Sequence, residues 1–554
     1  MTRQVLVINV TRMGDLVQMG TLLARLRDEW PGVAVDLVVD RQFEAVASML
    51  SGLRDIIAYD FHALIEESRI CAKDAVALYQ TVASWADDLH ERRYDRIINL
   101  TFNRSSALLA EYVGAPDIRG ARSAWDGGTV IDNPWMAYFT DIHQVRRINR
   151  FNLVDVYAMG GSGPGSFASL SVTAPAESKD WAGRFLSSPD GPDSRWIAVQ
   201  AGASDVMKAW RPQHFGTTLA RFSKCWDGGI LFVGSPTEQD TIAQVIRTYR
   251  EAGGHSVIKN AAGQTTLAQL VALLERCKLL LTNDTGPMHL AVGVQIPVID
   301  LSVGHVDFQE TGPYGPGHWV LQPDLECAPC GFDQVCSHHA CKDQLPTVAV
   351  TDVMLHVLGR GSLPLAVPGY RLYRSDVDAD QLGSFELISG REDATEVWYA
   401  AFWRRRWYEW FTGRPSRLPG LHNLPDPEEG VASIRTIMPL LDSLCRRADH
   451  IVRLTGQTPL PVRAIQALQR AQSEERQKAV QVGTTTWATK PLTTAALRLL
   501  YQDNVQGLVK MARHHAAAYH HWRRETEFVS SSLASAREAS ASSSIAPVSY
   551  AGIE

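Results

Sequence analysis

The sequence predicts an α/β protein with two doubly wound sheets, followed by an extension built of helices. Short apolar and β-branched runs alternate with amphipathic segments up to about residue 360. A stretch rich in Gly, Ser, Pro and Asp, from Gly160 to Asp193, interrupts this alternation once. From about residue 370 the alternation gives way to helical periodicity. Strands that alternate with helices usually pair in parallel, so two α/β domains joined by a linker are expected.

Length and charge narrow the class of protein. A chain of 554 residues is too long for one hydrophobic core and should form two or three domains. Its 54 basic and 60 acidic side chains give a net charge of -6, which offers no general electrostatic footprint for nucleic acid. The apolar run Val5 to Val10 is too short for a signal peptide or a membrane span. We therefore expect a cytoplasmic protein that does not act mainly on nucleic acid.

Residues 1–160 are expected to form the first α/β domain, and residues 161–194 the linker. Continuous apolar runs of this length suit the buried strands of a parallel sheet. The predicted strands of this domain are Val5 to Val10, Ala34 to Asp40, Arg54 to Asp60 and Asp95 to Leu100. The segments Leu16 to Trp30 and Ala75 to Arg92 are amphipathic and predict helices between them.

Residues 195–365 repeat the same pattern and predict a second α/β domain. Its predicted strands are Trp196 to Gly202, Gly229 to Ser235, His255 to Asn260, Lys278 to Asp284 and Pro297 to Ser302. Open α/β sheets place their ligands at the carboxyl ends of the strands. We therefore expect the two domains to face each other across a cleft whose loops carry the chemistry.

Residues 366–528 are predicted to form the helical extension, and residues 529–554 a disordered Ser/Ala-rich tail. One predicted helix, Trp398 to Phe411, is unusually aromatic and has Arg404 and Arg405 off its aromatic face. Such a helix could touch anionic lipid headgroups at a membrane surface. Alternatively, it packs against the catalytic domains or a partner subunit.

A tight turn follows the predicted strand that ends at Asp284. It carries Asp284, Thr285 and Gly286, and Pro287 then opens a helical pattern. The start of a helix presents unpaired N–H groups and the positive end of a dipole, which favours an anion such as a diphosphate. Asp284 could instead cap this helix, and His289 could lie in its core.

Four of the eight cysteines lie within fifteen residues. The cluster CAPCGFDQVCSHHAC contains Cys327, Cys330, Cys336 and Cys341. A C-x2-C pair followed by two more thiols could close a tetrahedral site for zinc or another soft metal. A loop that uses cysteine in a reducing compartment is the simpler alternative, because the second pair lacks the C-x2-C spacing.

Three segments carry a family resemblance, in the same order as in the family. They are NVTRMGDLVQMGTLLARLRDEWPGVAVDLVV, AGASDVMKAWRPQHF and AAGQTTLAQLVALLERCKLLLTNDTGPMHLAVGVQIPVI. They closely resemble the signature regions of glycosyltransferase family 9, which includes the ADP-heptose:lipopolysaccharide heptosyltransferases. The resemblance covers roughly residues 3 to 355. It implies a GT-B fold of two Rossmann-like domains, a nucleotide-sugar donor such as ADP-heptose, and inverting transfer that requires no cofactor.

The resemblance also implies roles for individual residues. Asp15 matches the family's catalytic base, and Gly14 before it lets the backbone approach a ligand closely; alternatively, Asp15 only caps the following helix. Lys208 matches the lysine that contacts the donor phosphates, with Ser204 on the same loop and Arg211 as a helper. The remaining donor positions implied are Glu238, Asp284, Thr285, Gly286 and His289. Glu238 could equally be a first-turn helix acid, and Gly263, Gln264 and Thr265 are expected to edge the adenine pocket.

Acceptor recognition is expected from the first domain. Gly14 and the loop residues Asn103, Arg104 and Ser105 follow predicted strands and could hold anionic or sugar groups. The segment LVQMGTLLARL after Asp15 lacks the family's usual proline, so the acceptor is left open. It is a glycan or glycolipid of the lipopolysaccharide core, or a surface protein such as flagellin. A third possibility is a nucleotide-sugar-binding scaffold that works through the helical extension. Peripheral contact at the cytoplasmic face of the inner membrane would fit a glycolipid acceptor.

Overall fold

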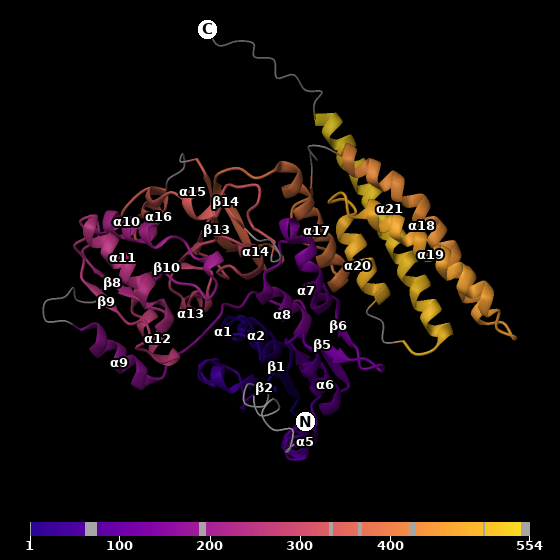
Figure 1. Cartoon of the computed structure of the whole chain (residues 1–554), viewed down its shortest axis with the longest axis horizontal. Helices are drawn as coiled ribbons and strands as arrows, with labels where there is room; N and C mark the ends of the chain where they lie inside the picture. Colours follow the sequence, from indigo (N-terminus) through magenta and orange to yellow (C-terminus); the bar gives the residue numbers. More distant parts are fainter. Residues whose placement is uncertain are drawn as a thin grey trace, which may run out of the picture. The chain divides into compact units, whose positions relative to one another are not determined.

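The computed structural model describes residues 2–60, 75–187, 195–331, 336–363, 368–421, 427–501 and 505–543. The chain divides into two compact units. Unit 1 comprises residues 1–121 and 151–391, and unit 2 comprises residues 122–150 and 392–554. Unit 1 contains two α/β domains, and unit 2 is mainly helical (Figure 1).

The first domain of unit 1 is a parallel sheet whose strands run in the order β3-β2-β1-β4-β5. The strands are β1 (Gln4–Ile8), β2 (Ala34–Asp40), β3 (Asp55–Tyr59), β4 (Arg96–Asn99) and β5 (Asp117–Ser123). This is the order of a Rossmann-like sheet, so the predicted doubly wound fold is confirmed. The first four strands were predicted from their apolar runs. β5 was not, because its sequence DIRGARS has no apolar run.

The helices of this domain cover both faces of the sheet. They are α1 (Met13–Gln18), α2 (Gly20–Glu29), α3 (Glu44–Ala47), α5 (Ala75–Glu91), α6 (Arg104–Val113) and α8 (Leu153–Gly161), with the 3-10 turn η1 (Arg41–Phe43). α5 and α6 pack together on one face, whereas α2 packs against α8. The core under α5 and α6 is apolar and fully enclosed, with Leu6, Ile8 and Ile97 from the strands at its centre.

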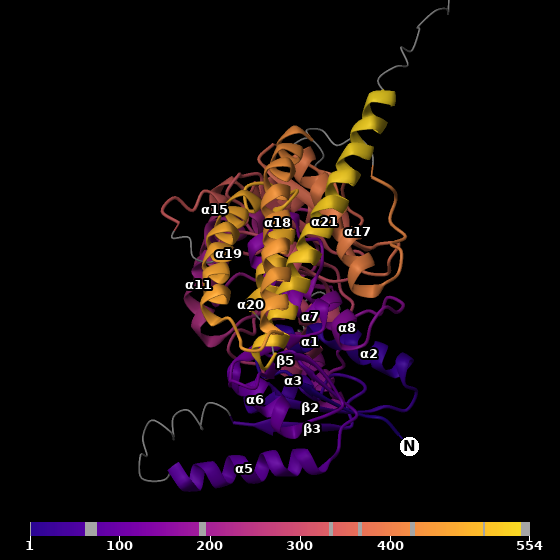
Figure 2. The same ribbon diagram turned by 90° about the vertical axis from the view of Figure 1, so that its right-hand side faces the viewer.

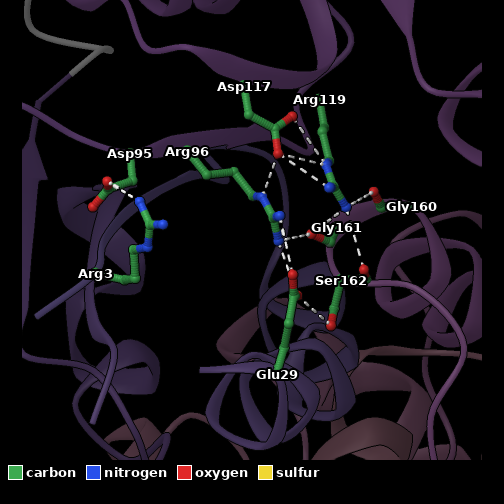
Figure 3. A network of polar contacts seen from close by, with 9 residues as sticks. All are labelled: Arg3, Glu29, Asp95, Arg96, Asp117, Arg119, Gly160, Gly161 and Ser162. Atoms are coloured by element: carbon green, nitrogen blue, oxygen red, sulfur yellow. Dashed lines mark hydrogen bonds and ion pairs between the residues drawn. The ribbon is translucent and has the colours of Figure 1, made fainter. Parts of the chain in front are cut away.

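An ion-pair network around the buried Arg96 guanidinium joins the amino ends of β4 and β5 (Figure 3). Arg96, the first residue of β4, donates to both carboxylate oxygens of Glu29 at 2.9 and 3.1 Å and to Asp117 at 2.7 Å. Arg119 donates to the carbonyl of Gly161 at 3.0 Å, at the carboxyl end of α8. Because a buried charge that loses its partner is costly, the network ties β4, β5, α2 and α8 into one arrangement. The network lies at the amino ends of the strands, and so at the end of the sheet opposite to their carboxyl ends.

The second domain has a larger sheet, in the order β14-β13-β12-β11-β10-β7-β8-β9. Its strands are β7 (Trp196–Gln200), β8 (Gly229–Phe232), β9 (Ile258–Asn260), β10 (Cys277–Asn283), β11 (Val298–Leu301), β12 (Trp319–Pro323), β13 (Tyr370–Val377) and β14 (Gly383–Ser389). The six strands from β7 to β12 are parallel and repeat the Rossmann-like order. β13 and β14 add to the edge in antiparallel fashion.

Helices cover both faces of this sheet as well. They are α9 (Ala176–Leu186), α10 (Pro212–Ser223), α11 (Gln239–Glu251), α12 (Leu267–Leu274), α13 (Gly286–Gly293), α14 (Phe308–Thr311), α15 (Cys341–Gln344) and α16 (Thr347–Val357), with the 3-10 turns η3 (Val206–Lys208) and η4 (Pro236–Glu238). α10 packs against α11 and α16, whereas α12 packs against α9 and α13. The two halves of the predicted GT-B fold are therefore both present in unit 1.

Three predicted boundaries differ from the structure. The predicted linker, residues 161–194, contains the helix α9. The predicted helical extension, residues 366–528, begins instead with β13 and β14, whose polar and charged residues face outward at a sheet edge and hid the strand signal. Residues 122–150 of the predicted first domain fall in unit 2.

Unit 2 is a helical bundle with one short strand. It contains β6 (Thr129–Asp132), α7 (Pro134–Val145), η2 (Arg146–Ile148), α17 (Ala394–Thr412), α18 (Glu428–Thr455), α19 (Val462–Gly483), α20 (Lys490–Tyr501) and α21 (Leu508–Ser543). α18 packs against both α19 and α21, and the three run side by side in both views (Figures 1 and 2). An all-helical character from α17 onward agrees with the sequence.

The aromatic side chains of α17 are largely buried within unit 2. Trp398, Trp403 and Trp407 are almost fully buried, and the Trp403 indole N–H donates to the Trp487 carbonyl at 2.7 Å. Phe411 stacks on Trp407 and meets the rings of α7. The expectation that this aromatic face touches lipid headgroups is therefore wrong, because the face is occupied within unit 2. Among the helices that the structure describes, none is long and apolar enough to cross a membrane.

The predicted disordered tail, residues 529–554, is helical over its first half, because α21 continues to Ser543. Val529, Leu533 and Ala536 are buried at helical spacing. This spacing was readable in the sequence, but the surrounding Ser and Ala residues obscured it. Residues 544–554 lie outside the described part of the chain.

Candidate active site

A pocket of about 600 Å³ lies in unit 1 and is lined by both α/β domains. The first domain contributes the loop after β1 and the start of α1, and the second contributes the loops after β7, β8 and β10. The lining residues that the sequence singled out are Gly14, Asp15, Ser204, Lys208, Glu238, Gly263, Thr265, Asp284, Thr285, Gly286 and His289. Residues from distant parts of the chain therefore meet at the carboxyl ends of two sheets, where α/β folds hold ligands.

Asp15 lies at the third position of α1, facing this pocket. The helix is capped at Arg12, so the alternative in which Asp15 is the N-cap is wrong. Thr11 donates its hydroxyl to the Asp15 carboxylate at 2.7 Å and to the Asn9 side chain at 2.9 Å. Asn9 in turn donates to the Asp15 carbonyl at 3.1 Å. The carboxylate is thus oriented by its own loop and leaves one oxygen for another partner.

Gly14 permits a close approach between the two domains. A Cβ atom on Gly14 would lie 2.8 Å from Cδ2 of His289, which is closer than such atoms pack. Gly14 also lines the pocket, so the expectation that it lets the backbone approach a ligand closely stays a prediction. His289 is 5% exposed, and burial lowers its pKa to about 4, with Asp15 opposing and Lys208 assisting the shift. His289 is therefore neutral at pH 7, in agreement with the core position considered from the sequence.

The turn between β10 and α13 is fixed from both sides. Asn283 accepts from the Trp210 backbone N–H at 3.0 Å and donates to the carbonyls of Ala201 and Gly202. The N-cap position of α13 belongs to Thr285, whose hydroxyl makes no cap hydrogen bond, so Asp284 is not the cap. Asp284 instead accepts from the Thr311 hydroxyl at 2.8 Å. Pro287 has no N–H, and the Met288 N–H donates to the Thr285 carbonyl at 3.0 Å, so the Gly286 N–H is the donor that the start of α13 can offer to the pocket.

Lys208 ends the short turn η3 in the loop after β7. Asp205 caps this turn by accepting from the Met207 N–H at 2.8 Å. The Lys208 ammonium makes no hydrogen bond or ion pair with any residue that the structure describes, and it lines the pocket beside the start of α13. Ser204 is exposed on the same loop. Arg211, expected to assist, instead pairs with Asp343 outside the pocket lining.

Glu238 stabilises the turn η4 and also lines the pocket. One of its carboxylate oxygens accepts from the Ser235 N–H at 2.6 Å and completes a capping box at η4. The other accepts from Gln200 at 2.9 Å. Gln200 also accepts from the Thr285 hydroxyl at 2.9 Å, so it links Glu238 to the start of α13. Gln200 was missed in the sequence because a single amide at a strand end has no distinctive pattern.

Asp300 adds a buried acid behind the pocket. It lies on β11, it is fully buried, and neither carboxylate oxygen has a hydrogen-bond partner among the described residues. Burial, and then the neighbouring Asp284, raise the pKa of Asp300 well above its usual value, against the opposing charge of Lys208. Burial thus favours the neutral form of Asp300, while Asp284 lines the pocket.

The predicted acceptor-side loop does not line this pocket. Asn103 is the N-cap of α6 and accepts from the Ser106 N–H at 2.9 Å, while Arg104 and Ser105 are exposed at the helix start. The Thr101 hydroxyl accepts from the Val10 N–H at 2.9 Å, so the loops after β4 and β1 are neighbours. Gln264, expected at the adenine edge, instead donates to the Asn260 carbonyl.

The four clustered cysteines are neighbours in the structure. Burial, followed by the nearby Cys327, Cys341 and Cys336, raises the pKa of Cys330 to about 11. All four are free thiols. Among the described residues, no group of three or more His, Cys, Asp or Glu side chains is arranged to hold a metal ion. A structural zinc here stays a prediction.

The two α/β domains form a GT-B fold with a pocket at the carboxyl ends of their sheets. Residues 82–341 match the family model "Glycosyltransferase family 9 (heptosyltransferase)". Residues 82–341 of this chain are therefore similar to glycosyltransferase family 9.

Curated proteins are also similar to parts of this chain. The chain is 26% identical over 171 residues to lipooligosaccharide heptosyltransferase 2 of Campylobacter jejuni, which covers 30% of this chain and 52% of that protein. It is 23% identical over 340 residues to lipopolysaccharide heptosyltransferase 2 of Escherichia coli K12, covering 58% of this chain and 85% of that protein. In the first case the match spans about half the length of the relative. The solved structure of E. coli ADP-heptose lps heptosyltransferase II is also similar, with a TM-score of 0.47 and 20% identity over 64% of this chain and 98% of that one.

Proposed function

We propose that this protein is a glycosyltransferase that moves a sugar from a nucleotide-sugar donor to an acceptor hydroxyl. One observation carries the proposal: Asp15 of the first domain lines the same pocket as Lys208 and the start of α13 of the second. A carboxylate on one wall and an unpaired cation on the other are the two groups that such a transfer needs.

Asp15 is proposed as the general base. It takes the proton from the acceptor hydroxyl while that oxygen attacks the anomeric carbon from the face opposite the diphosphate. The bond between the anomeric carbon and the phosphate oxygen breaks, and its electron pair leaves on the diphosphate, so the configuration inverts. The Thr11 hydroxyl holds one Asp15 oxygen in place, which supports a fixed direction for the second.

The second domain is proposed to stabilise the leaving diphosphate. Lys208 supplies a charge, and the start of α13 supplies the Gly286 N–H and the positive end of the helix dipole. Together these groups oppose the charge that develops on departure without calling on a metal. Ser204 can add a hydroxyl, and Glu238 can accept from ribose hydroxyls at the far end of the pocket.

ADP-heptose is the proposed donor, and lipopolysaccharide core the proposed acceptor. The support is the match of residues 82–341 to the family model, together with similar proteins named lipooligosaccharide and lipopolysaccharide heptosyltransferases. The exposed loop residues Asn103, Arg104 and Ser105, adjacent to the loop that carries Asp15, are proposed to contact the acceptor. Such an acceptor would place the enzyme at the cytoplasmic face of the inner membrane.

A donor screen followed by a transfer assay tests the proposal. Purified protein is mixed with ADP-heptose, ADP-glucose, UDP-glucose and GDP-mannose, and thermal shift identifies the donor that binds. Heptose-deficient lipopolysaccharide core and flagellin are then offered as acceptors, and release of the nucleotide and mass of the product are measured. We expect ADP-heptose to stabilise the protein most and the lipopolysaccharide core to gain one heptose. Binding without transfer to either acceptor would favour the scaffold, and glycosylated flagellin would favour the protein acceptor.

A further inference from the structure

Unit 2 contains a cavity that the proposed transfer does not use. It measures about 220 Å³ and lies among α18, α19 and α21. Its floor is apolar: Ala448 and Ile451 of α18 and Ala512 of α21 are buried there. Met511 lines the same wall, and its flexible thioether can adapt to an occupant. Leu508 and Gln469 are exposed at the rim, so the cavity opens to solvent.

The polar side of this cavity is formed mainly by α19, which contributes Gln469, Gln472, Ser473 and Arg476. Across from it, α21 contributes His515. The lining contains no Asp or Glu, so its ionisable groups are a guanidinium and an imidazole. The charge of this lining therefore favours an anion.

Arg476 is held in place without a carboxylate. The Tyr519 hydroxyl lies close to the guanidinium, and the Tyr501 ring lies 5.2 Å from the guanidinium carbon. No Asp or Glu among the described residues forms an ion pair with it. By contrast, Arg447 and Arg523 of the same helices pair with Glu475 and Asp442 at 2.8 and 2.6 Å. A pre-positioned arginine that lacks an acidic partner retains donors for a carboxylate.

Gln472 gives an independent indication of a missing acceptor. It is 8% exposed, and its amide nitrogen has no hydrogen-bond partner among the described residues. A buried amide N–H that stays unpaired costs free energy, and rotation of the terminal amide would direct it to an acceptor in the cavity. One turn of α19 separates Gln472 from Arg476, so both can reach one ligand group.

We propose that this cavity binds a small organic acid, with a carboxylate on Arg476 and Gln472 and an apolar body against Ile451, Met511 and Ala512. The size agrees with this class of ligand, because an apolar cavity of about 150 Å³ accommodates benzene. The additional volume here has room for one carboxylate group. The site lies in unit 2 and is separate from the pocket proposed for sugar transfer.

Fluorine NMR on the full chain tests this site, with 4-fluorobenzoate as the probe and 4-fluorobenzyl alcohol as its uncharged counterpart. We expect the acid to bind with a dissociation constant in the millimolar range or below and the alcohol at least tenfold more weakly. Arg476→Met should weaken binding of the acid about tenfold or more, because the charge-assisted contact is lost. Arg470→Met is the matched control, since Arg470 is exposed on the same helix outside the lining, and it should bind as the wild type does.

Ala512→Leu provides a second test of the site that does not depend on whether Arg476→Met folds. Ala512→Leu fills the apolar floor and should abolish binding of the probe, while far-ultraviolet circular dichroism and the thermal midpoint report whether the bundle is intact. Nucleotide binding in unit 1 should be unchanged in every variant, which separates this proposal from the proposed transferase activity. Equal affinity for the acid and the alcohol, or unchanged affinity in a folded Arg476→Met or Ala512→Leu protein, would overturn the assignment.

Discussion

Replacing Lys208 with methionine tests the proposed diphosphate site most quantitatively. The Lys208 ammonium has no partner among the described residues, so its removal breaks no internal contact, and the free energy of unfolding should change by less than about 0.5 kcal/mol. A contact between this charge and a phosphate contributes about 1.5 to 3 kcal/mol. Since 1.4 kcal/mol is about tenfold in affinity, ADP should bind roughly 10- to 150-fold more weakly.

Isothermal titration with ADP and with adenosine is the assay. Adenosine lacks the phosphates, so its affinity should be the same in the wild type and in Lys208→Met. Lys278→Met is the control, because Lys278 is exposed on β10 of the same domain and does not line the pocket. The reasoning would be refuted by an ADP affinity that matches the wild type, or by an equal loss for adenosine.

Three further outcomes are expected. Thr11→Val should lower the turnover rate about tenfold at unchanged ADP affinity, because Asp15 loses its 2.7 Å hydrogen bond from the Thr11 hydroxyl. Thr11→Ser keeps a hydroxyl and should turn over at the wild-type rate. Equal turnover rates in the wild type and both variants would contradict a positioning role for Thr11. Gly304→Ala should weaken ADP binding and lower the thermal midpoint of unfolding. Gly304 has a φ of +76°, and a Cβ atom added there would lie 2.2 Å from the Met207 carbonyl oxygen and displace the loop that carries Lys208. Calorimetry checks the midpoint, and titration with ADP checks the affinity. Burial lowers the pKa of His318 to about 4, so the contribution of His318 to stability is present above pH 6.5 and is lost as the pH falls toward 4. Between pH 7 and pH 4, the free energy of unfolding of the wild type should therefore fall by about 3 kcal/mol more than that of His318→Asn. An equal fall in the two proteins, measured by chemical denaturation at both pH values, would argue against this.

Most of the α/β architecture could be predicted from the sequence, because parallel strands buried on both faces need continuous apolar runs. β1 and β10 are of this kind, and both were predicted. β5 and the antiparallel pair β13 and β14 were not, since strands at or near a sheet edge carry charged residues that give no such run. The periodicity of the helices in unit 2 was readable, but the division of the chain into two units was not, because residues 122–150 join the helices of the extension through tertiary contacts.

The residues that line the pocket could be predicted from the sequence more completely than the residues that hold them in position. Asp15, Lys208, Asp284 and His289 line one pocket, as the resemblance implied. Thr11, which orients Asp15, lies only four positions from it and was overlooked. Gln200 and Thr311, which hold the turn before α13, lie 85 and 27 positions from their partners, and only the fold brings these together. The pairing of Arg211 with Asp343 could not be predicted for the same reason, because Asp343 lies on α15, far from Arg211 in the sequence.

The central claim is that Asp15 is the base for sugar transfer in a pocket whose other wall holds the nucleotide. The most direct measurement compares the wild type with Asp15→Asn, which has nearly the same shape but cannot accept the proton. The rate of transfer from ADP-heptose to heptose-deficient lipopolysaccharide core and the affinity for ADP are measured on the same preparations. We predict that transfer falls by two or more orders of magnitude, on the scale of general base catalysis, while ADP binds as before. Transfer near the wild-type rate in Asp15→Asn would contradict the account.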